Sequence, residues 1–276
     1  MKVVFITVNY CQAELTINLL ENLSRISGTK DIKVIVVDNS NDKDDVKKIQ
    51  DYKNRDKTLS LDILKAPSNM GYFGAVNFAL KSLSHLYDFD FLIVSNNDIE
   101  IRDEAFFENL RALMGGPEII APDIVSTVTG KHQNPHRLNK ITKNQKLQYR
   151  LLFTNYYFGL TLYLGRKLVK KMLFHDAKMN KPGKMFIYSA HGAFIVFSKA
   201  YFEKGGTIDD GYFLYGEEDS IAAQCEKSGM KILMTPELQV YHNEHVSTDG
   251  SGFKRKIYLL QKKAYKYIKA NYPNFY

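Results

Sequence analysis

The sequence predicts an α/β fold built on a doubly wound, mostly parallel sheet. Short apolar runs rich in β-branched residues alternate with segments of helical spacing over residues 1–98, and this order of strand and helix is typical of such a sheet. Polar residues follow each apolar run directly, as they do where parallel strands end at a ligand-binding edge. With 276 residues, 45% of them apolar, the chain can bury a substantial core.

The elements of this pattern can be placed in order along the N-terminal part of the chain. Strands are predicted where Val, Ile, Leu and Phe cluster, over residues 3–8, 33–37, 60–64 and 89–95. Helices are predicted between them, over residues 14–23, in the charged segment before residue 60, and over residues 71–83.

The remainder of the chain departs from the alternation and then returns to it. Residues 123–185 are basic and aromatic without clear strand alternation, whereas residues 185–197 read MFIYSAHGAFIVF and predict a strand. A short helix over residues 198–204 and a helix over residues 220–228, with Gly229 as its C-cap, are predicted next. A last strand over residues 231–234 and a basic C-terminal helix complete the pattern.

Positive charge is concentrated in two regions. Residues 131–185 hold thirteen Lys or Arg and one acid, and residues 250–276 hold seven basic residues and no acid. Because the formal net charge of the chain is +8, the remaining residues are acidic on balance. Basic regions favour anionic partners such as a membrane surface, a pyrophosphate lipid or nucleic acid, although an ordinary solvated face has the same composition.

The composition indicates a cytoplasmic protein. Two cysteines are too few for a disulfide framework, and we interpret both as small core residues. The apolar start MKVVFITV is too short for a secretory signal peptide. No stretch reaches the roughly 18 apolar residues of a membrane span. We therefore expect a peripheral protein on the inner face of the cytoplasmic membrane, to which the basic regions would bind.

Three short motifs could carry chemistry. FLIVSNND places Asp98 after a predicted strand, where a carboxylate can hold Mg²⁺ or Mn²⁺ on a diphosphate or simply form a turn. FLYGEED places Glu217 and Glu218 at the start of a helix, where like charge can raise one pKa and create a general base or the acids can serve only the helix dipole. VYHNEH supplies His242, which a structural role would explain as well.

The motifs are far more specific in combination. The order VNY, VVDNS, NMGYFGAVN, NND, a Gly-Ala strand, FLYGEED and VYH resembles glycosyltransferase family 2, and most closely its rhamnosyltransferase-like, cell-surface polysaccharide branch. The resemblance covers residues 1–125 and 186–248. It implies a GT-A fold and a nucleotide diphospho-sugar donor of the UDP or dTDP type.

The resemblance also divides the chain by role. Residues 1–122 would form the nucleotide-sugar-binding half of a GT-A domain. Residues 123–250 would form the acceptor-binding half, which includes the basic, helical insertion at residues 131–185. Residues 251–276 would form a basic amphipathic C-terminal helix.

The resemblance assigns seven residues to the donor. They are Thr7, Val8, Tyr10, Asp38, Asn69, Gly71 and Asn97. Of these, Val8 and Tyr10 would line the nucleobase pocket and Asp38 would bind the base or the ribose. Asn69 and Gly71 would flank the nucleotide.

The resemblance gives the metal and the base as well. Asn97 and Asp98 occupy the place of the metal-binding DXD motif, and His242 falls on a histidine that in some members reaches the metal or the diphosphate. Mn²⁺ or Mg²⁺ is therefore the expected cofactor. Glu217 and Glu218 fall on the family's ED pair, with Glu218 as the expected general base.

The sequence departs from the family pattern at two positions. Cys11 stands where the VNYN motif has its last Asn, and Asn96 replaces the first acid of DXD, so Asp98 is left as the lone carboxylate there. The expected reaction is an inverting transfer to a hydroxyl of a glycan or lipid-linked glycan. In it, Glu218 takes the acceptor proton and the metal on Asp98 neutralises the departing diphosphate.

Two other classes of protein fit parts of the sequence. A sugar nucleotidyltransferase is also α/β, but it usually opens with a G-x-G-T-R loop, and this chain reads VNYCQAE there. A non-catalytic module could bind a membrane or nucleic acid through the basic regions, yet it would have no need for Asp98, Glu218 and His242 together. Because no recognised nucleic-acid-binding motif occurs, we expect no nucleic-acid partner.

Overall fold

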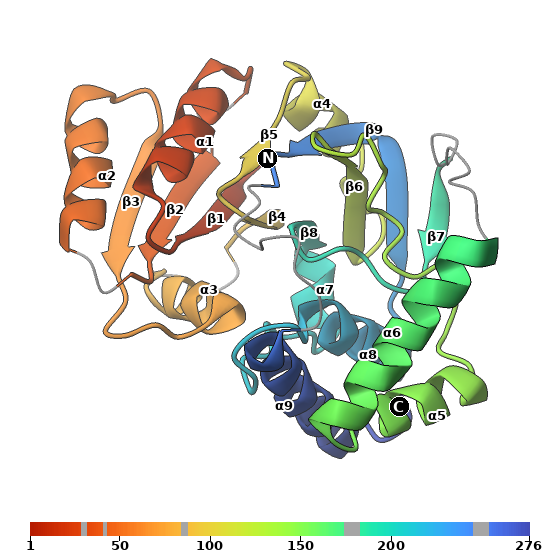
Figure 1. Cartoon of the computed structure of the whole chain (residues 1–276). Helices are drawn as coiled ribbons and strands as arrows, with labels where there is room; N and C mark the ends of the chain where they lie inside the picture. The colour runs from red at the N-terminus through yellow and green to blue at the C-terminus, as the bar shows by residue number, and fades with distance from the viewer. Residues whose placement is uncertain (29–31, 41–42, 84–87, 174–182, 245–253) are drawn as a thin grey trace.

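The computed structural model shows a mixed α/β sheet with helices on both faces (Figure 1). It describes residues 1–28, 32–40, 43–83, 88–173, 183–244 and 254–276. The strands are β1 (Val3–Asn9), β2 (Ile32–Asp38), β3 (Ser60–Lys65), β4 (Phe91–Ser95), β5 (Ile99–Glu100), β6 (Ile119–Ser126), β7 (Met185–Ile187), β8 (Phe194–Ser198) and β9 (Ile232–His242). The helices are α1 (Ala13–Arg25), α2 (Lys43–Arg55), α3 (Tyr72–Lys81), α4 (Phe106–Arg111), α5 (Lys143–Leu152), α6 (Tyr156–Leu173), α7 (Lys199–Glu203), α8 (Glu217–Ser228) and α9 (Arg255–Asn271).

The strand order confirms the predicted fold class. The sheet runs β3-β2-β1-β4-β8-β6-β9-β5, and β7 also pairs with β9. The first four of these strands are parallel, as are β6 and β9, whereas β8 is antiparallel to both of its neighbours. The order reverses at β1, because β2 lies on one side of it and β4 on the other. Such a reversal opens a crevice at the carboxyl ends of the strands, where ligands bind in sheets of this kind.

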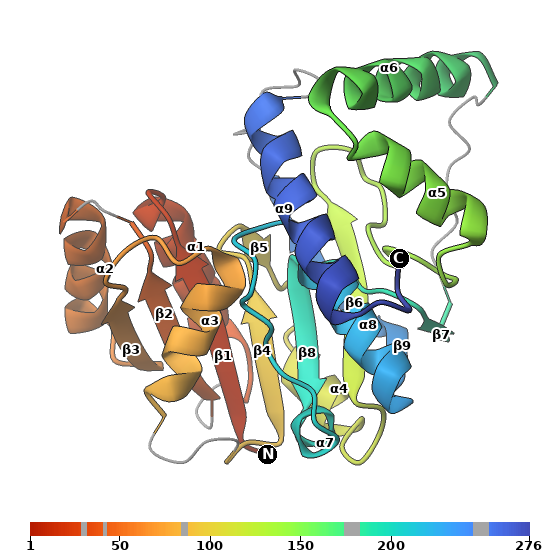
Figure 2. The ribbon, with the colours of Figure 1, turned by 90° about the horizontal axis from the view of Figure 1, so that it is seen from below.

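Two apolar cores cover the two faces of the sheet. Alternate residues of β1 point to opposite faces, so Val4 and Ile6 join one core while Val3 and Phe5 join the other. The first core is completed by buried residues of α3, α7, α8 and α9, and the second by residues of α1, α2 and α4. Figure 2 shows α3 and α9 on the near side of the sheet.

The structure refines two predictions in the C-terminal half. The run over residues 185–197 is two strands, β7 and β8, because the chain turns between Tyr188 and Ala193. The expected strand over residues 231–234 extends to His242 as β9, and its register against β6 shifts between Pro122 and Asp123. Sequence periodicity misses both features, since an apolar turn resembles a strand and Pro236 resembles a strand end.

Gly71 packs closely against the backbone of the second half of the chain. Its backbone has a φ of 74°, and a Cβ there would lie 2.0 Å from the carbonyl oxygen of Phe213. The next amide, of Tyr72, donates to that same carbonyl over 3.3 Å. Only glycine permits both the left-handed backbone and the close approach. The loop before α3 is thereby fastened to the segment that leads into α8.

The C-terminal helix does not offer a free apolar face. We expected a basic amphipathic C-terminal helix in a region that would bind the membrane, but the apolar residues Tyr258, Ala264, Tyr265 and Ile268 of α9 are buried against the body. Their burial fixes α9 to the fold as an ordinary packed helix. Among the helices that the structure describes, none is long and apolar enough to cross a membrane.

Candidate active site

A buried polar network lies at the carboxyl ends of β1 and β2. The Asn9 side chain, at the end of β1, donates from Nδ2 to Oδ1 of Asp38 (2.8 Å), Oγ of Ser40 (3.2 Å) and Oδ2 of Asp45 (3.1 Å). Its Oδ1 accepts a hydrogen bond from the Thr16 hydroxyl at 2.9 Å. One buried amide therefore ties β1 to α1, to β2 and to the start of α2.

Asp38 is fully buried at the end of β2. Its Oδ1 also accepts from the Ser40 hydroxyl at 2.6 Å, and its Oδ2 is paired with the Lys65 ammonium at the end of β3. Because both oxygens have protein partners, a direct bond from Asp38 to a base or ribose would have to share or replace one of them. That contact stays a prediction, and in the structure Asp38 organises the ends of three strands.

Asn39 holds the loop that was expected to flank the nucleotide, and sequence reasoning gave it no role. Its Nδ2 donates to Oδ1 of Asn69 and to the carbonyl of Gly71, both at 3.0 Å, and its Oδ1 accepts from the Met70 amide at 2.8 Å. Asn69 and Gly71 are therefore brought directly beside the end of β2.

The residues around β1 are distributed between the interior and the surface. Thr7 is fully buried and its hydroxyl has no hydrogen-bond partner within the described residues, whereas Val8 is partly buried. Tyr10 is 52% exposed just beyond the strand, where a ring can stack on a planar base. Cys11 is exposed, which corrects its interpretation as a core residue, and has a φ of 54°. Asn adopts this left-handed region more readily than most residues, which fits the Asn that the VNYN motif has at this position.

Asp98 and His242 meet although they lie far apart in the sequence. Strand β5 pairs with β9 so that Ile99 is opposite His242, and Oδ1 of Asp98 lies 3.2 Å from Nε2 of His242. The other ring nitrogen, Nδ1, lies 2.8 Å from Oε1 of Gln133. Asn97 points elsewhere, since its amide donates to the Thr16 hydroxyl at 3.0 Å.

The Asp98–His242 pair fits a divalent cation that takes most of its ligands from elsewhere. Oδ1 of Asp98 is buried without a well-oriented hydrogen bond, and a carboxylate oxygen beside an imidazole nitrogen is a recurrent pair of metal ligands. No group of three His, Cys, Asp or Glu side chains able to hold a metal occurs in the part of the chain described. A bound metal would therefore depend on the diphosphate and water for its remaining ligands.

The two acids at the start of α8 have different environments. Glu217 is only 6% exposed; its Oε2 accepts from the Gly216 amide at 2.8 Å, and its Oε1 has no partner among the described residues. Burial raises the pKa of Glu217 to about 8, and the negative charge of Glu218 adds to the effect. Glu218 is only partly buried, and its Oε1 accepts from the Gly192 amide at 3.1 Å.

The Tyr72 hydroxyl lies within the electrostatic reach of all three acids. It is buried and has no hydrogen-bond partner in the described residues. Burial raises the pKa of Tyr72 well above its usual value, and the charges of Glu217, Asp98 and Glu218 raise it further. Tyr72 belongs to the NMGYFG motif, yet only the tertiary structure reveals its place among the carboxylates.

A row of histidines connects the two groups of acids. The His191 ring lies 6.0 Å from that of His242 and 6.2 Å from that of His136. Burial lowers the pKa of His191, although the charge of Glu218 opposes this. Sequence reasoning missed His191, whose only signal is its position before Gly192 in the turn between β7 and β8.

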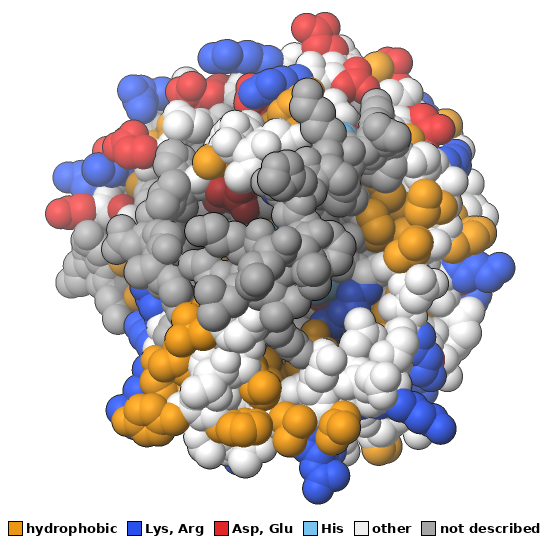
Figure 3. Space-filling view, turned by 45° about the vertical axis from the view of Figure 1, so that its right-hand side comes forward, with side chains coloured by type: hydrophobic (Ala, Val, Ile, Leu, Met, Phe, Trp, Pro, Cys, Tyr) orange, Lys and Arg blue, Asp and Glu red, His pale blue; other side chains and the backbone are white. Residues whose placement is uncertain are grey.

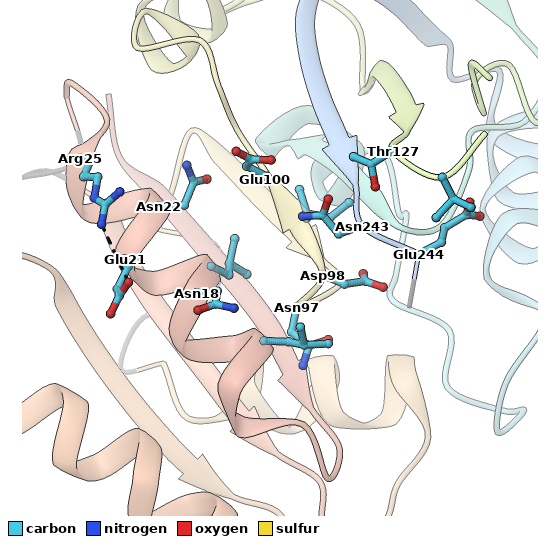
Figure 4. Close-up of a pocket in the computed structure, with 14 residues that line it drawn as sticks. Asn18, Glu21, Asn22, Arg25, Asn97, Asp98, Glu100, Thr127, Asn243 and Glu244 are labelled. Atoms are coloured by element: carbon cyan, nitrogen blue, oxygen red, sulfur yellow. Dashed lines mark ion pairs between the residues drawn. The ribbon is translucent and has the colours of Figure 1, made fainter. Parts of the chain in front are cut away.

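A cavity of about 610 Å³ adjoins this site (Figure 4). It opens between α1 and the segments around β5 and the end of β9, and Asn97 and Asp98 form part of its wall. Glu217, Glu218 and Tyr72 are not among the residues that line it. Of Asp98, Glu217 and Glu218, only Asp98 lines this cavity.

We expect Glu217→Gln to gain stability over the wild type as the pH rises. The pKa of this carboxyl rises from an ordinary 4.5 to about 8 on folding. The protonated Glu217 therefore contributes its full share to the folding free energy below pH 4.5, and this share is lost as the pH rises through about 8. The Gln side chain does not titrate. Urea unfolding in the presence of EDTA should show the difference growing by about 1–3 kcal/mol from about pH 5 to pH 9.

Glu226→Gln, on the same helix, is the matched control for this measurement. Burial acts against ionisation of Glu226, but hydrogen bonds from Lys140 and Tyr188 lower its pKa overall. Its substitution should therefore cost stability at neutral pH and less in acid, which is the opposite sign. A pH-independent difference for Glu217→Gln would contradict its description as an enclosed acid.

Comparison with known proteins extends these observations. The sequence matches the family model described as glycosyl transferase family 2 over residues 3–200, and a search of curated proteins finds no match. Three similar solved structures are GalNAc-T7 with UDP, GalNAc and Mn²⁺, the mannosyltransferase PcManGT from Pyrobaculum calidifontis with GDP-Man and Mn²⁺, and S. aureus TarS 1–349 with UDP-GlcNAc.

The three structures share the fold at low sequence identity. Their TM-scores are 0.64, 0.55 and 0.55, at 14%, 13% and 14% identity, and the matches cover 98%, 99% and 94% of this chain. They cover 48%, 71% and 63% of the other chains, so this chain spans about half of GalNAc-T7. The sheet is thus of the GT-A type. Since the family model matches well over half of the sequence, the chain belongs to glycosyltransferase family 2.

Proposed function

We propose that the protein is an inverting glycosyltransferase that moves a sugar from a nucleotide diphospho-sugar to a hydroxyl of a glycan or lipid-linked glycan. The observation that carries the proposal is that Glu218 is bonded to the turn that carries His191, whose ring lies 6.0 Å from that of His242, the partner of Asp98. Family membership supports the reaction class. The nucleotide sugars in the PcManGT and TarS structures support the donor class.

The proposed reaction is a single in-line displacement. The acceptor oxygen bonds to the anomeric carbon while the bond from that carbon to the diphosphate oxygen breaks, and the diphosphate leaves with the electron pair. Glu218 accepts the acceptor proton, since it is less buried than Glu217 and its carboxylate is oriented by the Gly192 amide. Glu217 is enclosed, and its raised pKa of about 8 keeps it protonated at neutral pH, so we assign it a supporting role beside Glu218 and not that of the base.

The donor would lie across the ends of β1, β2 and β4. Tyr10 is exposed there and would stack on the base, while Asn69 and Gly71 would flank the nucleotide on the loop that Asn39 fastens. Asp98 and His242 would hold Mn²⁺ or Mg²⁺, which would neutralise charge on the departing diphosphate. Manganese in the GalNAc-T7 and PcManGT structures supports this choice of cofactor.

The basic, aromatic insertion supports a place on an anionic membrane surface, where a lipid-linked acceptor for cell-surface polysaccharide synthesis would lie. Among the side chains described on α5 and α6, the exposed large apolar ones are Leu147, Leu151, Tyr157, Phe158, Tyr163 and Leu164. Figure 3 shows hydrophobic side chains along the lower part of this face, with Lys and Arg beside them. In Figure 2, α6 stands beyond the sheet edge at which β1 and β4 end. An apolar face flanked by basic residues is typical of interfacial helices.

Glu218→Gln should lower kcat by about 10²–10⁴-fold and leave donor binding nearly intact, because it removes the proton acceptor and keeps the shape. The measurement is nucleotide release from a panel of UDP-, dTDP- and GDP-sugars with Mn²⁺, alongside calorimetric binding of the free nucleotide. Glu226→Gln, at the far end of α8, is the control and should retain turnover. Wild-type turnover in Glu218→Gln would reject this base and make Glu217 the next candidate.

Asp98→Ala should abolish the dependence of nucleotide binding on metal, because it removes the carboxylate ligand. Calorimetric titration of UDP and dTDP with and without Mn²⁺ should show an affinity gain of tenfold or more in the wild type, which is about 1.4 kcal/mol, and little gain in the variant. Asp62→Ala is the control, because this acid lies on β3 and its side chain is 49% exposed. An unchanged metal dependence in Asp98→Ala would refute the metal role.

The double substitution Tyr157→Ser and Phe158→Ser should weaken binding to anionic vesicles. Tyr157 is 75% exposed, so the change removes interfacial contacts without opening the core. Co-sedimentation with phosphatidylglycerol vesicles should fall several-fold, and high salt should release the wild type because each basic residue contributes about 1 kcal/mol. Met114→Ser, an exposed apolar residue elsewhere, should bind like the wild type. Equal binding to neutral and anionic vesicles would refute the electrostatic attachment.

A further inference from the structure

Asp219 bridges two distant segments at the start of α8. One of its carboxylate oxygens accepts a hydrogen bond from the Arg137 guanidinium, and the other accepts one from the Tyr276 hydroxyl. The Arg137 and Asp219 side chains are only 18% and 14% exposed. Arg137 precedes α5, and Tyr276 follows α9. The carboxylate next to Glu218 is thus the point at which the insertion and the C-terminal segment meet.

An aromatic cage surrounds this junction. Arg137 also donates to the Tyr149 hydroxyl of α5 over 2.8 Å. The Tyr276 ring packs 5.3 Å from that of Tyr149 and 4.7 Å from that of Tyr265 on α9. Burial raises the pKa of Tyr276 and the charge of Asp219 raises it further, so the hydroxyl keeps its proton and donates. Charge-assisted hydrogen bonds between largely buried groups are stronger and better ordered than ion pairs between exposed groups.

The backbone around Arg137 also holds Glu218. The Arg137 amide donates to the Ser189 carbonyl at 3.1 Å, and the Ser189 amide donates back at 3.0 Å. The Ser189 hydroxyl then donates to the carbonyl of Glu218 at 3.2 Å. Three residues on, the Gly192 amide bonds the Glu218 carboxylate. Arg137 is therefore linked to Glu218 twice, through Asp219 in α8 and through the turn that precedes β8.

We propose that Arg137, Asp219 and Tyr276 form a clamp that positions Glu218 by fixing the first turn of α8 to the α5 insertion and to the segment after α9. The inference rests on the proposed function, in which Glu218 is the general base. None of the three residues touches the reacting atoms in this scheme; they are positioning residues. The clamp lets the acceptor-side insertion and the base move as one unit, so contacts made on α5 reach the base through Arg137.

Tyr276→Phe tests the clamp with the smallest change, since it removes one hydroxyl and keeps the packed ring. Hydrogen–deuterium exchange of residues 214–222 should become at least severalfold faster, because the first turn of α8 loses an anchor. Nucleotide release from UDP- and dTDP-sugars with Mn²⁺ should show kcat lowered by about 5- to 20-fold with an unchanged donor KM, since misplacement affects the transition state more than donor binding.

Two further variants separate positioning from general stability. Tyr272→Phe also removes a tyrosine hydroxyl bonded to an aspartate, Asp209, at 2.7 Å, and should leave exchange at residues 216–220 and kcat unchanged. Asp219→Asn keeps an acceptor for the Tyr276 hydroxyl and should retain more activity than Asp219→Ala, although both variants lose the ion pair with Arg137.

The outcomes distinguish failure of the clamp from failure of the proposed function. Unchanged exchange in Tyr276→Phe overturns the clamp whatever the enzyme does. Equal effects of Tyr276→Phe and Tyr272→Phe on exchange at residues 216–220 and on kcat also overturn it, because they indicate general destabilisation. Faster exchange at residues 214–222 in Tyr276→Phe alone supports the clamp. If that occurs while the wild type releases nucleotide from no donor, the physical clamp stands and the proposed function fails.

Discussion

A buried carboxylate at the end of β2 sets the arrangement of the carboxyl ends of β1, β2 and β3. An unpaired charge in the interior costs several kcal/mol, and Asp38 avoids this cost with bonds from Asn9, Ser40 and Lys65. Those partners come from the ends of β1, β2 and β3, so satisfying one charge aligns three strand ends. Asn9 then reaches α1 through Thr16, and the neighbouring Asn39 fastens the loop before α3. The surface on which a nucleotide would lie follows from these bonds.

The same sheet brings the acids of the second half to this edge. Strand β8 pairs antiparallel with β4, and the turn before it carries His191 and Gly192 to the end of β4. Strand β5 pairs with the end of β9 and sets Asp98 against His242. Gly71 approaches the Phe213 carbonyl closely, and the segment before α8 therefore packs against the loop before α3. Each contact depends on backbone pairing or close backbone approach, which makes the geometry insensitive to surface side chains.

Repulsion among three acids shapes the protonation of the site. Asp98, Glu217 and Glu218 all act on the buried Tyr72 hydroxyl, and like charges in a partly buried site repel one another. Protonation of Glu217 relieves part of this repulsion, consistent with its raised pKa. A divalent cation at Asp98 would relieve more. Glu218, which is less buried and is bonded to a backbone amide, is the carboxylate to which the proposed mechanism assigns the acceptor proton.

The sequence alone determined the fold class and the chemical motifs. Short apolar runs predicted β1 to β4 and helical spacing predicted helices between them, because strands buried on both faces are apolar at nearly every position. The acids Asp98, Glu217 and Glu218 were identifiable because the order of the motifs resembles glycosyltransferase family 2. Taken alone, a position after a strand or at the start of a helix also fits a structural role. The turn between β7 and β8 and the full length of β9 were not, since both depend on the strands beside them.

Only the tertiary structure decided which residues meet and which faces are covered. Sequence reasoning gave His191, Tyr72 and Asn39 no role, and these residues gain their places through sheet pairing and loop contacts. The apolar stripe of α9 has the pattern of an interfacial helix, yet it is buried, whereas α5 and α6 keep apolar residues exposed. An amphipathic pattern states that one face must leave water, but the neighbouring elements determine what covers that face.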